Sequence, residues 1–270
     1  MLDVGSGPPV VVLPGVQGRW EWMRPAVGAL AERCRVLTDS LPGERGSLAG
    51  LDPERGFDLH VAWVDALLDR AGLRRAVVCG VSYGGLVALR YAAVRPERTA
   101  GLVIVSSPAP AWRPNCRVDW YLAWPRLLFP VFALSSPRRL YPEIKAAFPN
   151  LLRRGRFGLQ HLYRVTRYPC TPAPMAQRVR LLAGADFAAD CRRVAAPALV
   201  VTGDPGLDRV VPVESTRTYV EALAGGAEYA RIPRTGHMGL MTRPERFRDL
   251  VGDFAAVHDA AAPVPLAVPA

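Results

Sequence analysis

The stretch Val77-Val78-Cys79-Gly80-Val81-Ser82-Tyr83-Gly84-Gly85 decides the fold of this chain. Its first residues continue an apolar run, 76–79, that is short and β-branched, as buried strands are. The motif Gly80-Val81-Ser82-Tyr83-Gly84 follows, and the residues of 86–91 favour a helix. A strand, a G-x-S-x-G motif and a helix in this order are the context of a nucleophile elbow.

The glycines of this motif have a physical purpose. Gly80 and Gly84 lack side chains, so the strand and the helix can pass close to each other. Ser82 would then lie on a tight turn in a normally unfavourable backbone conformation, with its hydroxyl lifted clear of the sheet. The helix N-terminus behind it favours negative charge. The motif therefore predicts a reactive serine.

The composition limits the class of protein. The chain has 270 residues, of which 50% are hydrophobic, enough for one large α/β domain or a core with an inserted subdomain. Its first residues lack the pattern of a signal peptide, and no apolar run approaches the roughly 20 residues of a membrane span. The five cysteines are scattered, odd in number and without C-x-x-C spacing, which argues against a disulfide framework and a zinc site. We therefore expect a cytoplasmic protein without a metal.

Strand-like and helix-like segments alternate along the chain. Strands are predicted at 10–13, 35–38, 76–79, 100–105, 198–202 and 229–232, and the main helices at 25–34, 58–71, 86–91, 213–223 and 244–257. This alternation is typical of an α/β protein with a mostly parallel sheet and helices on both faces.

The pattern changes after Ser106-Ser107-Pro108. Residues 109 to about 190 are rich in Pro, Trp and Arg and favour short helical pieces without a convincing strand. We therefore predict a core of 1–108 and 195–258, a helical cap of 109–194, and a disordered tail of 259–270. The ligand crevice of an open parallel sheet lies outside the carboxyl ends of its strands, so a cap that leaves the sheet here would cover Ser82.

A serine hydroxyl needs a base beside it to become a nucleophile. The chain has four histidines, and His237 follows the last predicted strand directly, in a loop at its carboxyl end. His60 falls within a predicted helix, His161 in the insertion, and His258 near the C-terminus. His237 is therefore the candidate base.

An acid must orient that histidine, and two compete after the strand that ends at Thr202. Asp204 stands next to a glycine turn, where Asp is common for its local hydrogen bonds alone. Asp208 lies deeper in the loop, before Val210-Val211-Pro212. We favour Asp208, which gives the order Ser, Asp, His along the chain.

The whole chain, cap included, resembles the α/β-hydrolase fold family, in its branch of small lidded enzymes. The matching segments are 80–85, 208–212 and Gly236-His237, with 22–25 and the loop 39–47 as weaker matches. The resemblance implies that Ser82 is the nucleophile, His237 the base and Asp208 the orienting acid. It also implies an oxyanion hole, for which the backbone N–H groups of Val16 and Tyr83 are the candidates by position.

Two features depart from the family pattern. Pro14-Gly15 stands where the family often has His-Gly, which puts catalytic efficiency in question because each oxyanion donor is worth about 10²–10³ in rate. The first predicted strand begins only at Val10, so the sheet is expected to be smaller or to leave an edge for a partner. Related enzymes that open epoxides or displace halide use an Asp nucleophile, and Ser82 argues against both.

The positive charge is concentrated in the insertion. Between Ala109 and Arg193, fourteen arginines and one lysine stand against four acidic residues, so this segment accounts for all of the net charge of +10. The arginines form a solvated face, or they attract an acidic substrate or an anionic membrane surface. The aromatic residues there form the cap's own core or an apolar lining. No nucleic-acid-binding motif accompanies the charge.

These features predict a serine hydrolase that cleaves a carboxylic ester or a related, possibly acidic, small-molecule acyl substrate through an acyl-enzyme, with no cofactor. An acyltransferase, a carbon–carbon bond hydrolase or a cofactor-free haloperoxidase could use the same triad. A non-catalytic binding protein of this fold is the alternative from another class.

Overall fold

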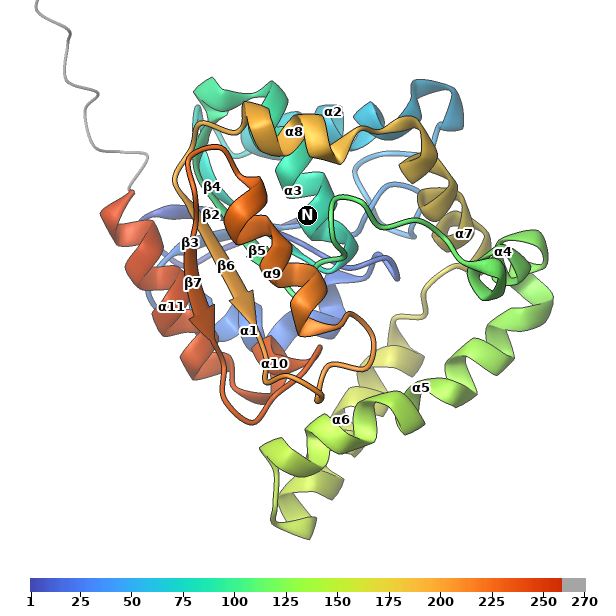
Figure 1. The fold of residues 1–270 in the computed structure, drawn as a ribbon. Helices are drawn as coiled ribbons and strands as arrows, with labels where there is room; N and C mark the ends of the chain where they lie inside the picture. The colour runs from blue at the N-terminus through green and yellow to red at the C-terminus, as the bar shows by residue number, and fades with distance from the viewer. Residues whose placement is uncertain (259–270) are drawn as a thin grey trace, which may run out of the picture.

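The computed structural model describes residues 1–258 and contains one seven-stranded sheet in the order β1-β3-β2-β4-β5-β6-β7 (Figure 1). The strands are β1 (Leu2–Val4), β2 (Pro9–Leu13), β3 (Arg35–Thr38), β4 (Ala76–Val81), β5 (Thr99–Val105), β6 (Ala198–Thr202) and β7 (Glu228–Arg231). Every neighbouring pair is parallel except β1 and β3. The predicted tail, 259–270, lies outside the described residues.

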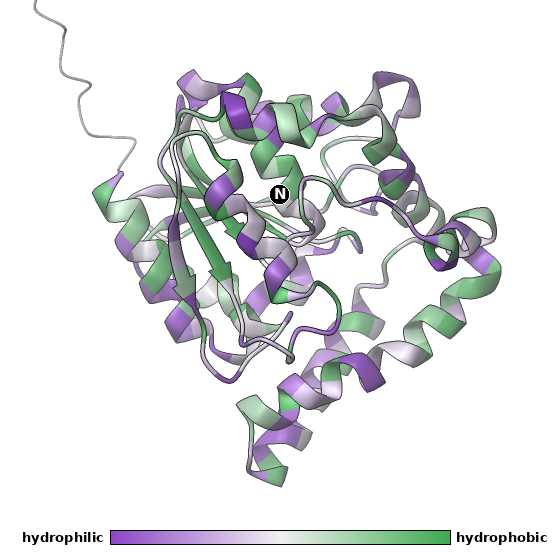
Figure 2. Ribbon diagram, viewed as in Figure 1, coloured by the Kyte–Doolittle hydropathy of each residue, from purple (hydrophilic) through white to green (hydrophobic). Residues whose placement is uncertain are grey.

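The central strands are apolar along their whole length because both faces of the sheet are covered. In β2, Val11 and Leu13 point into one hydrophobic cluster while Val10 and Val12 point into the other, as the two-residue period of a strand requires. All four are fully buried. Figure 2 shows the hydrophobic sheet between helices that are hydrophilic on their outer sides.

Helices cover both faces. One face packs against α2 (Leu59–Arg70), α3 (Tyr83–Val94), α8 (Phe187–Arg193) and α9 (Val213–Ala222). The other packs against α1 (Arg24–Leu30), α10 (Gly239–Thr242) and α11 (Pro244–Val257). The predicted α/β class with a mostly parallel, helix-flanked sheet is confirmed.

The edge of the sheet differs from the prediction, because β1 precedes Val10 and pairs antiparallel with β3 from Leu2 opposite Thr38 to Val4 opposite Val36. Three residues are too few for a hydrophobic period to be recognised in a sequence. The strand is held by an ion pair across the edge, in which Arg35 donates two hydrogen bonds to the Asp3 carboxylate. The edge strand on this side of the sheet is therefore β1 and not β3.

The segment between β5 and β6 forms α4 (Cys116–Ala123), α5 (Pro125–Ala147), α6 (Leu151–Arg167) and α7 (Pro172–Leu181) before α8. In Figure 1, α4, α5 and α6 extend away from the sheet on one side. None of the helices within 1–258 is long and apolar enough to cross a membrane.

The prediction of short helical pieces is wrong for α5 and α6, which have 23 and 17 residues. Helix α5 continues through Pro130, Pro137 and Pro142. Each proline leaves the carbonyl four residues earlier without its helical donor. Those carbonyls belong to Arg126, Ala133 and Arg138, which are all exposed, so water can satisfy them.

A buried ion pair connects α7 to the core. Arg178 and Glu44 have fully buried side chains 2.8 Å apart, and Arg178 also donates hydrogen bonds to the carbonyls of Val16 (2.9 Å) and Pro42 (3.0 Å). The guanidinium of Arg178 therefore connects α7 of the inserted segment to the loops that follow β2 and β3.

We predict that Arg178→Met lowers the free energy of unfolding by about 3–5 kcal/mol, because it leaves the Glu44 carboxylate buried without its cation. Urea denaturation followed by circular dichroism measures the effect. Arg180→Met, at an exposed position of the same helix, is the matched control and should change stability by no more than about 0.5 kcal/mol. Equal effects of the two substitutions would contradict the assignment.

Candidate active site

Ser82 lies between β4 and α3 in a strained conformation, with φ 55° and ψ −120°. A non-glycine residue adopts such a backbone only where its surroundings enforce it. A Cβ at Gly80 would collide with the carbonyl oxygen of Gly84, and one at Gly84 with the carbonyl oxygen of Leu13. The sequence thus folds locally into the tight strand–turn–helix that the motif predicts, with strand, helix and the neighbouring strand in close contact.

The loop after β2 lies against this serine. A Cβ at Gly15 would stand 3.4 Å from the Cβ of Ser82, and Arg178 holds the carbonyl of the next residue, Val16. Tyr83 is the first residue of α3, where a backbone N–H has no acceptor within the helix. Its side chain is buried, with the hydroxyl donating to the Arg178 carbonyl at 3.0 Å. Gly15, which precedes Val16, and the first residue of α3 therefore both lie next to Ser82.

His237 and Asp208 are in contact. The Nδ1 atom of His237 lies 3.1 Å from Oδ2 of Asp208, whose side chain is almost fully buried. The other oxygen, Oδ1, accepts the backbone N–H groups of Val210 and Val211 at 2.9 and 2.8 Å. A carboxylate only accepts hydrogen bonds, so Nδ1 carries the proton and Nε2 is left as the basic nitrogen.

Asp204, the competing acid, has other partners. Its Oδ2 accepts the backbone N–H of Arg234 at 2.7 Å, and its Oδ1 lies 3.3 Å from Nε of Arg231. Asp204 therefore binds β7 and the loop that follows it, and these contacts do not involve the imidazole of His237.

The surroundings of His237 stabilise its protonated form. Burial lowers the pKa of this imidazole, but the Asp208 carboxylate, through its charge and its hydrogen bond, together with the charge of Glu143, outweighs burial and raises the pKa above its usual value. A base with a raised pKa holds a proton more strongly, as general-base catalysis near neutral pH requires.

Glu143 of α5 is a buried acid that the sequence analysis did not identify. Its Oε2 accepts the backbone N–H groups of Gly236 (2.9 Å) and Met238 (2.8 Å), the two neighbours of His237. The side chain is fully buried, and burial is the main cause that raises its pKa to about 7. A carboxylate from the insertion thus holds the loop that carries the histidine.

We predict that Glu143→Ala lowers kcat/KM by about 10²-fold, because a displacement of about 1 Å of a catalytic group has an effect of that size. In Glu143→Gln, one amide oxygen can still accept both N–H groups while the negative charge is removed. The pKa of His237 should then fall, and the acid limb of the pH–rate profile should move to lower pH. Profiles of the wild type and both variants test this, and unchanged profiles in both would contradict it.

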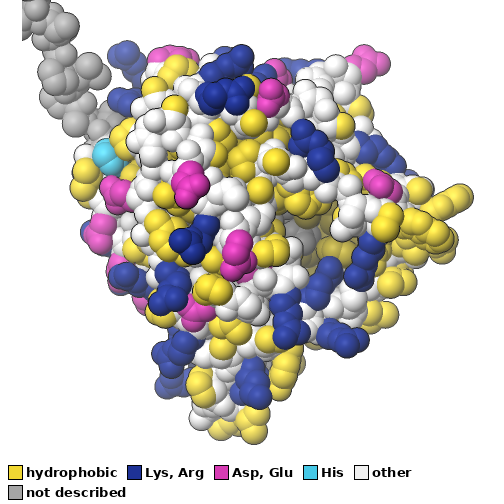
Figure 3. Space-filling model, viewed as in Figure 1, with side chains coloured by type: hydrophobic (Ala, Val, Ile, Leu, Met, Phe, Trp, Pro, Cys, Tyr) yellow, Lys and Arg dark blue, Asp and Glu magenta, His cyan; other side chains and the backbone are white. Residues whose placement is uncertain are grey.

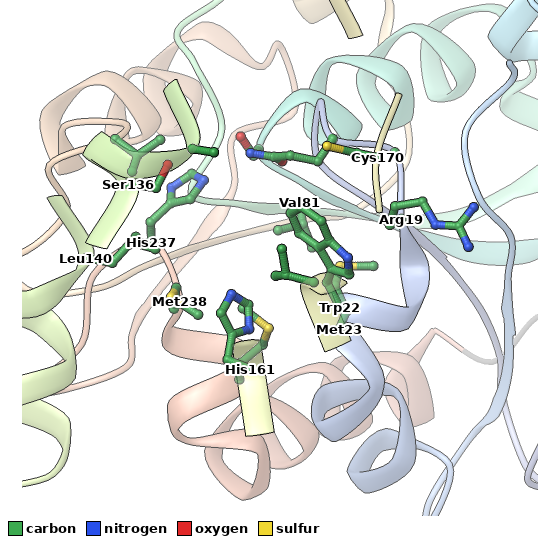
Figure 4. A pocket seen from close by; sticks show the side chains of 18 of the residues that line it. Arg19, Trp22, Met23, Val81, Ser136, Leu140, His161, Cys170, His237 and Met238 are labelled. Carbon is green, nitrogen blue, oxygen red and sulfur yellow. The ribbon is translucent and has the colours of Figure 1, made fainter. Parts of the chain in front are cut away.

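A cavity of about 350 Å³ opens over Ser82 and His237, a size typical of small-molecule sites. Figure 4 shows His237 and Ser136 on one side of it and Trp22 and Met23 on another, with the guanidinium of Arg19 directed away. The lining is mostly apolar and includes Phe129, Phe132, Ala133, Leu140, Val165, Val210, Leu240 and Met241.

The cavity contains few polar groups. Arg19 forms an ion pair with Glu21, whereas Arg139 contacts Ser136 Oγ at 3.2 Å and the ring of Phe132. His161 also lines the cavity, and burial lowers its pKa to about 4. Within 1–258, no group of three or more His, Cys, Asp or Glu side chains is placed to hold a metal ion.

The other two histidines lie elsewhere. His60 is buried under Tyr83, and burial lowers its pKa to about 4. His258 caps the C-terminal end of α11 and stacks edge-on against Phe254. Of the four histidines, only His237 contacts an acid in the described part of the chain.

Comparisons with known proteins agree with this architecture. A family model described as "Alpha/beta hydrolase family" matches residues 10–250. The chain is 28% identical over 270 residues to a 2-hydroxymuconate semialdehyde hydrolase of Pseudomonas sp. (strain CF600), covering 96% of this chain and 91% of the relative. It is 30% identical over 242 residues to a pimeloyl-(acyl-carrier protein) methyl ester esterase of Aromatoleum aromaticum, covering 81% and 86%.

A search of solved structures gives the same fold. The crystal structure of the enol-lactonase from Burkholderia xenovorans LB400 matches with a TM-score of 0.74 and 21% sequence identity, over 94% of each chain.

Proposed function

The chain belongs to the alpha/beta hydrolase family, and we propose that it is a serine hydrolase that cleaves a carboxylic ester through a Ser82-His237-Asp208 triad. One observation carries the proposal: the strained Ser82 and the Asp208-bound His237 line the same cavity. Residues 109–194 act in it as the cap, since side chains of α5 and α6 line that cavity.

In this proposal, His237 Nε2 takes the hydroxyl proton as Ser82 Oγ attacks the acyl carbonyl. The backbone N–H groups of Val16 and Tyr83 stabilise the oxyanion of the tetrahedral intermediate. The C–O bond to the leaving alcohol then breaks, and the imidazolium gives the alcohol its proton. Water deprotonated by His237 attacks the acyl-enzyme, and the acid leaves as Ser82 regains its proton. No step requires a metal or organic cofactor.

The cavity suggests the substrate. Its apolar walls suit an acyl chain. Arg139 forms no ion pair among the described residues and offers a positive charge to an acidic group at the far end of that chain. We therefore propose an apolar acyl ester, with or without a terminal carboxylate. One relative is named a methyl ester esterase, which supports this class. A cytoplasmic location remains a prediction from the sequence.

The relative named a semialdehyde hydrolase favours carbon–carbon bond hydrolysis as the second candidate. Turnover assays separate ester hydrolysis from carbon–carbon bond hydrolysis. The ester substrates are p-nitrophenyl acetate, butyrate and octanoate and monoesters of dicarboxylic acids, and the substrate for carbon–carbon bond hydrolysis is 2-hydroxymuconate semialdehyde. We expect ester turnover that rises with acyl length, is present in the wild type and is absent in Ser82→Ala. Turnover of the semialdehyde alone would favour the second candidate, and binding without turnover of either would favour a binding protein.

A further inference from the structure

Helices α4 and α5, with Trp124 between them, carry residues spaced alternately three and four apart. These residues are Arg117, Trp120, Trp124, Leu127, Val131, Leu134, Arg138, Tyr141 and Lys145. Within α5 this spacing places Leu127, Val131, Leu134, Arg138, Tyr141 and Lys145 along one side of the helix. Trp124, with φ −128° and ψ 58°, separates them from Arg117 and Trp120 on α4. The six large apolar members are 52% to 81% exposed. We call these nine residues the cap row.

The apolar character of the cap row is not explained by the cavity. Phe129, Phe132 and Leu140, between members of the row, line the cavity from α5. One side of α5 therefore faces the cavity while the row stays exposed. A folded protein rarely exposes this many large apolar side chains on two adjacent helices without an interaction partner.

The cap row also contains positively charged side chains. Arg117, Arg138 and Lys145 are members of it and are all exposed. Figure 3 shows hydrophobic side chains projecting where Figure 1 places α4, and again at the tip where α5 turns into α6, with Arg and Lys side chains between these two areas. Helix α6 adds exposed apolar side chains next to arginines, namely Leu151, Leu152, Leu159, Leu162 and Tyr163. The row thus combines Trp, Leu and cations.

We propose that the cap row docks on an anionic lipid surface, with its tryptophans and leucines in the interfacial layer and its cations against the lipid headgroups. Exposed Trp and Leu partition into the boundary between headgroups and acyl chains. Arg and Lys bury their stems beside apolar surface while their charged ends reach phosphate groups. Each cation near an anionic leaflet strengthens binding about fivefold.

A second copy of the chain suits the row less well. Two copies would bring together two insertions that each hold fifteen basic and four acidic residues between 109 and 193, and like charges oppose such contact. A coiled coil of two such helices would use the positions beside the row for side chains that pair with the partner helix. On α5 these positions hold Pro130, Pro137 and Pro142, which cannot form such pairs. A lipid surface supplies negative charge and needs no regular helical partner.

Vesicle co-sedimentation tests the proposal without reference to catalysis. The wild type is mixed with vesicles of phosphatidylcholine containing phosphatidylglycerol and with vesicles of phosphatidylcholine alone. We expect binding to the anionic vesicles that weakens with added salt, and little binding to the neutral ones. Trp120→Ser/Leu134→Ser should lower the affinity at least tenfold, and Arg117→Gln/Arg138→Gln about 25-fold.

The control variants carry changes of the same kind at exposed positions of the α/β core. Arg70→Gln/Arg74→Gln removes two exposed cations, and Val257→Ser one exposed apolar side chain. These variants should bind like the wild type. Absence of binding to anionic vesicles, or equal losses in core and row variants, would overturn the proposal. A wild-type dimer that Trp120→Ser/Leu134→Ser converts to a monomer, without lipid binding, would assign the row to a second copy instead.

Discussion

Ser82→Ala should lower kcat for ester hydrolysis by about 10⁶-fold, since removal of the nucleophile of a serine triad has an effect of that order. The substitution removes one oxygen from the elbow and leaves Gly80, Gly84 and the contacts of α3 unchanged. The remaining turnover should come from general binding and oxyanion stabilisation alone. Stopped ester assays at saturating substrate measure it.

Ser136→Ala is the matched control, because Ser136 also lines the cavity but lies on α5. Its Oγ donates to the carbonyl of Phe132 at 2.9 Å within the helix. This variant should retain most of the wild-type kcat. If Ser82→Ala remains as active as Ser136→Ala while both stay folded by circular dichroism, Ser82 is not the nucleophile.

Asp208→Asn should lower kcat by about 10⁴-fold, the effect expected when the acid of a triad becomes an amide. The amide can present an N–H to Nδ1 of His237, which favours the tautomer with the proton on Nε2. That nitrogen can then no longer accept the proton of Ser82.

The wild-type pH–rate profile should lose activity as the pH falls through the raised pKa of His237, because the imidazole must be neutral to act as a base.

Asp204→Asn is the control for Asp208→Asn. It changes the other acid of the same loop, which contacts Arg231 and Arg234, and should retain kcat within a small factor. If Asp204→Asn causes the larger loss, the acid has been assigned to the wrong residue.

Local features explain what the sequence could predict. The elbow depends on residues within ten positions of Ser82, so the motif together with the strand before it and the helix after it predicts it. Placing His237 and Asp208 together required one further rule, that the loops at the carboxyl ends of parallel strands meet at one edge. The contact between the two side chains at 3.1 Å follows from that placement.

Contacts between distant segments explain what it could not predict. Glu143 approaches the loop of His237 from 93 and 95 residues away in sequence, and nothing beside it in the chain indicates that partner. The length of α5 was underestimated because proline is a strong helix breaker in sequence terms, whereas exposed carbonyls tolerate it. The sequence analysis assigned the aromatic residues of the insertion to a core or an apolar lining, and only the structure shows that Trp120, Trp124 and Tyr141 are exposed.

Labelling with a fluorophosphonate probe, followed by peptide mass spectrometry, tests the central claim most directly. The probe reacts much faster with an activated serine than with other side chains, so we expect one adduct in the wild type, on the peptide that contains Ser82. Ser82→Ala and His237→Ala should give none, while Ser136→Ala labels like the wild type. An unlabelled but folded wild type, or an adduct on another serine, would contradict the assignment of Ser82 as the nucleophile activated by His237.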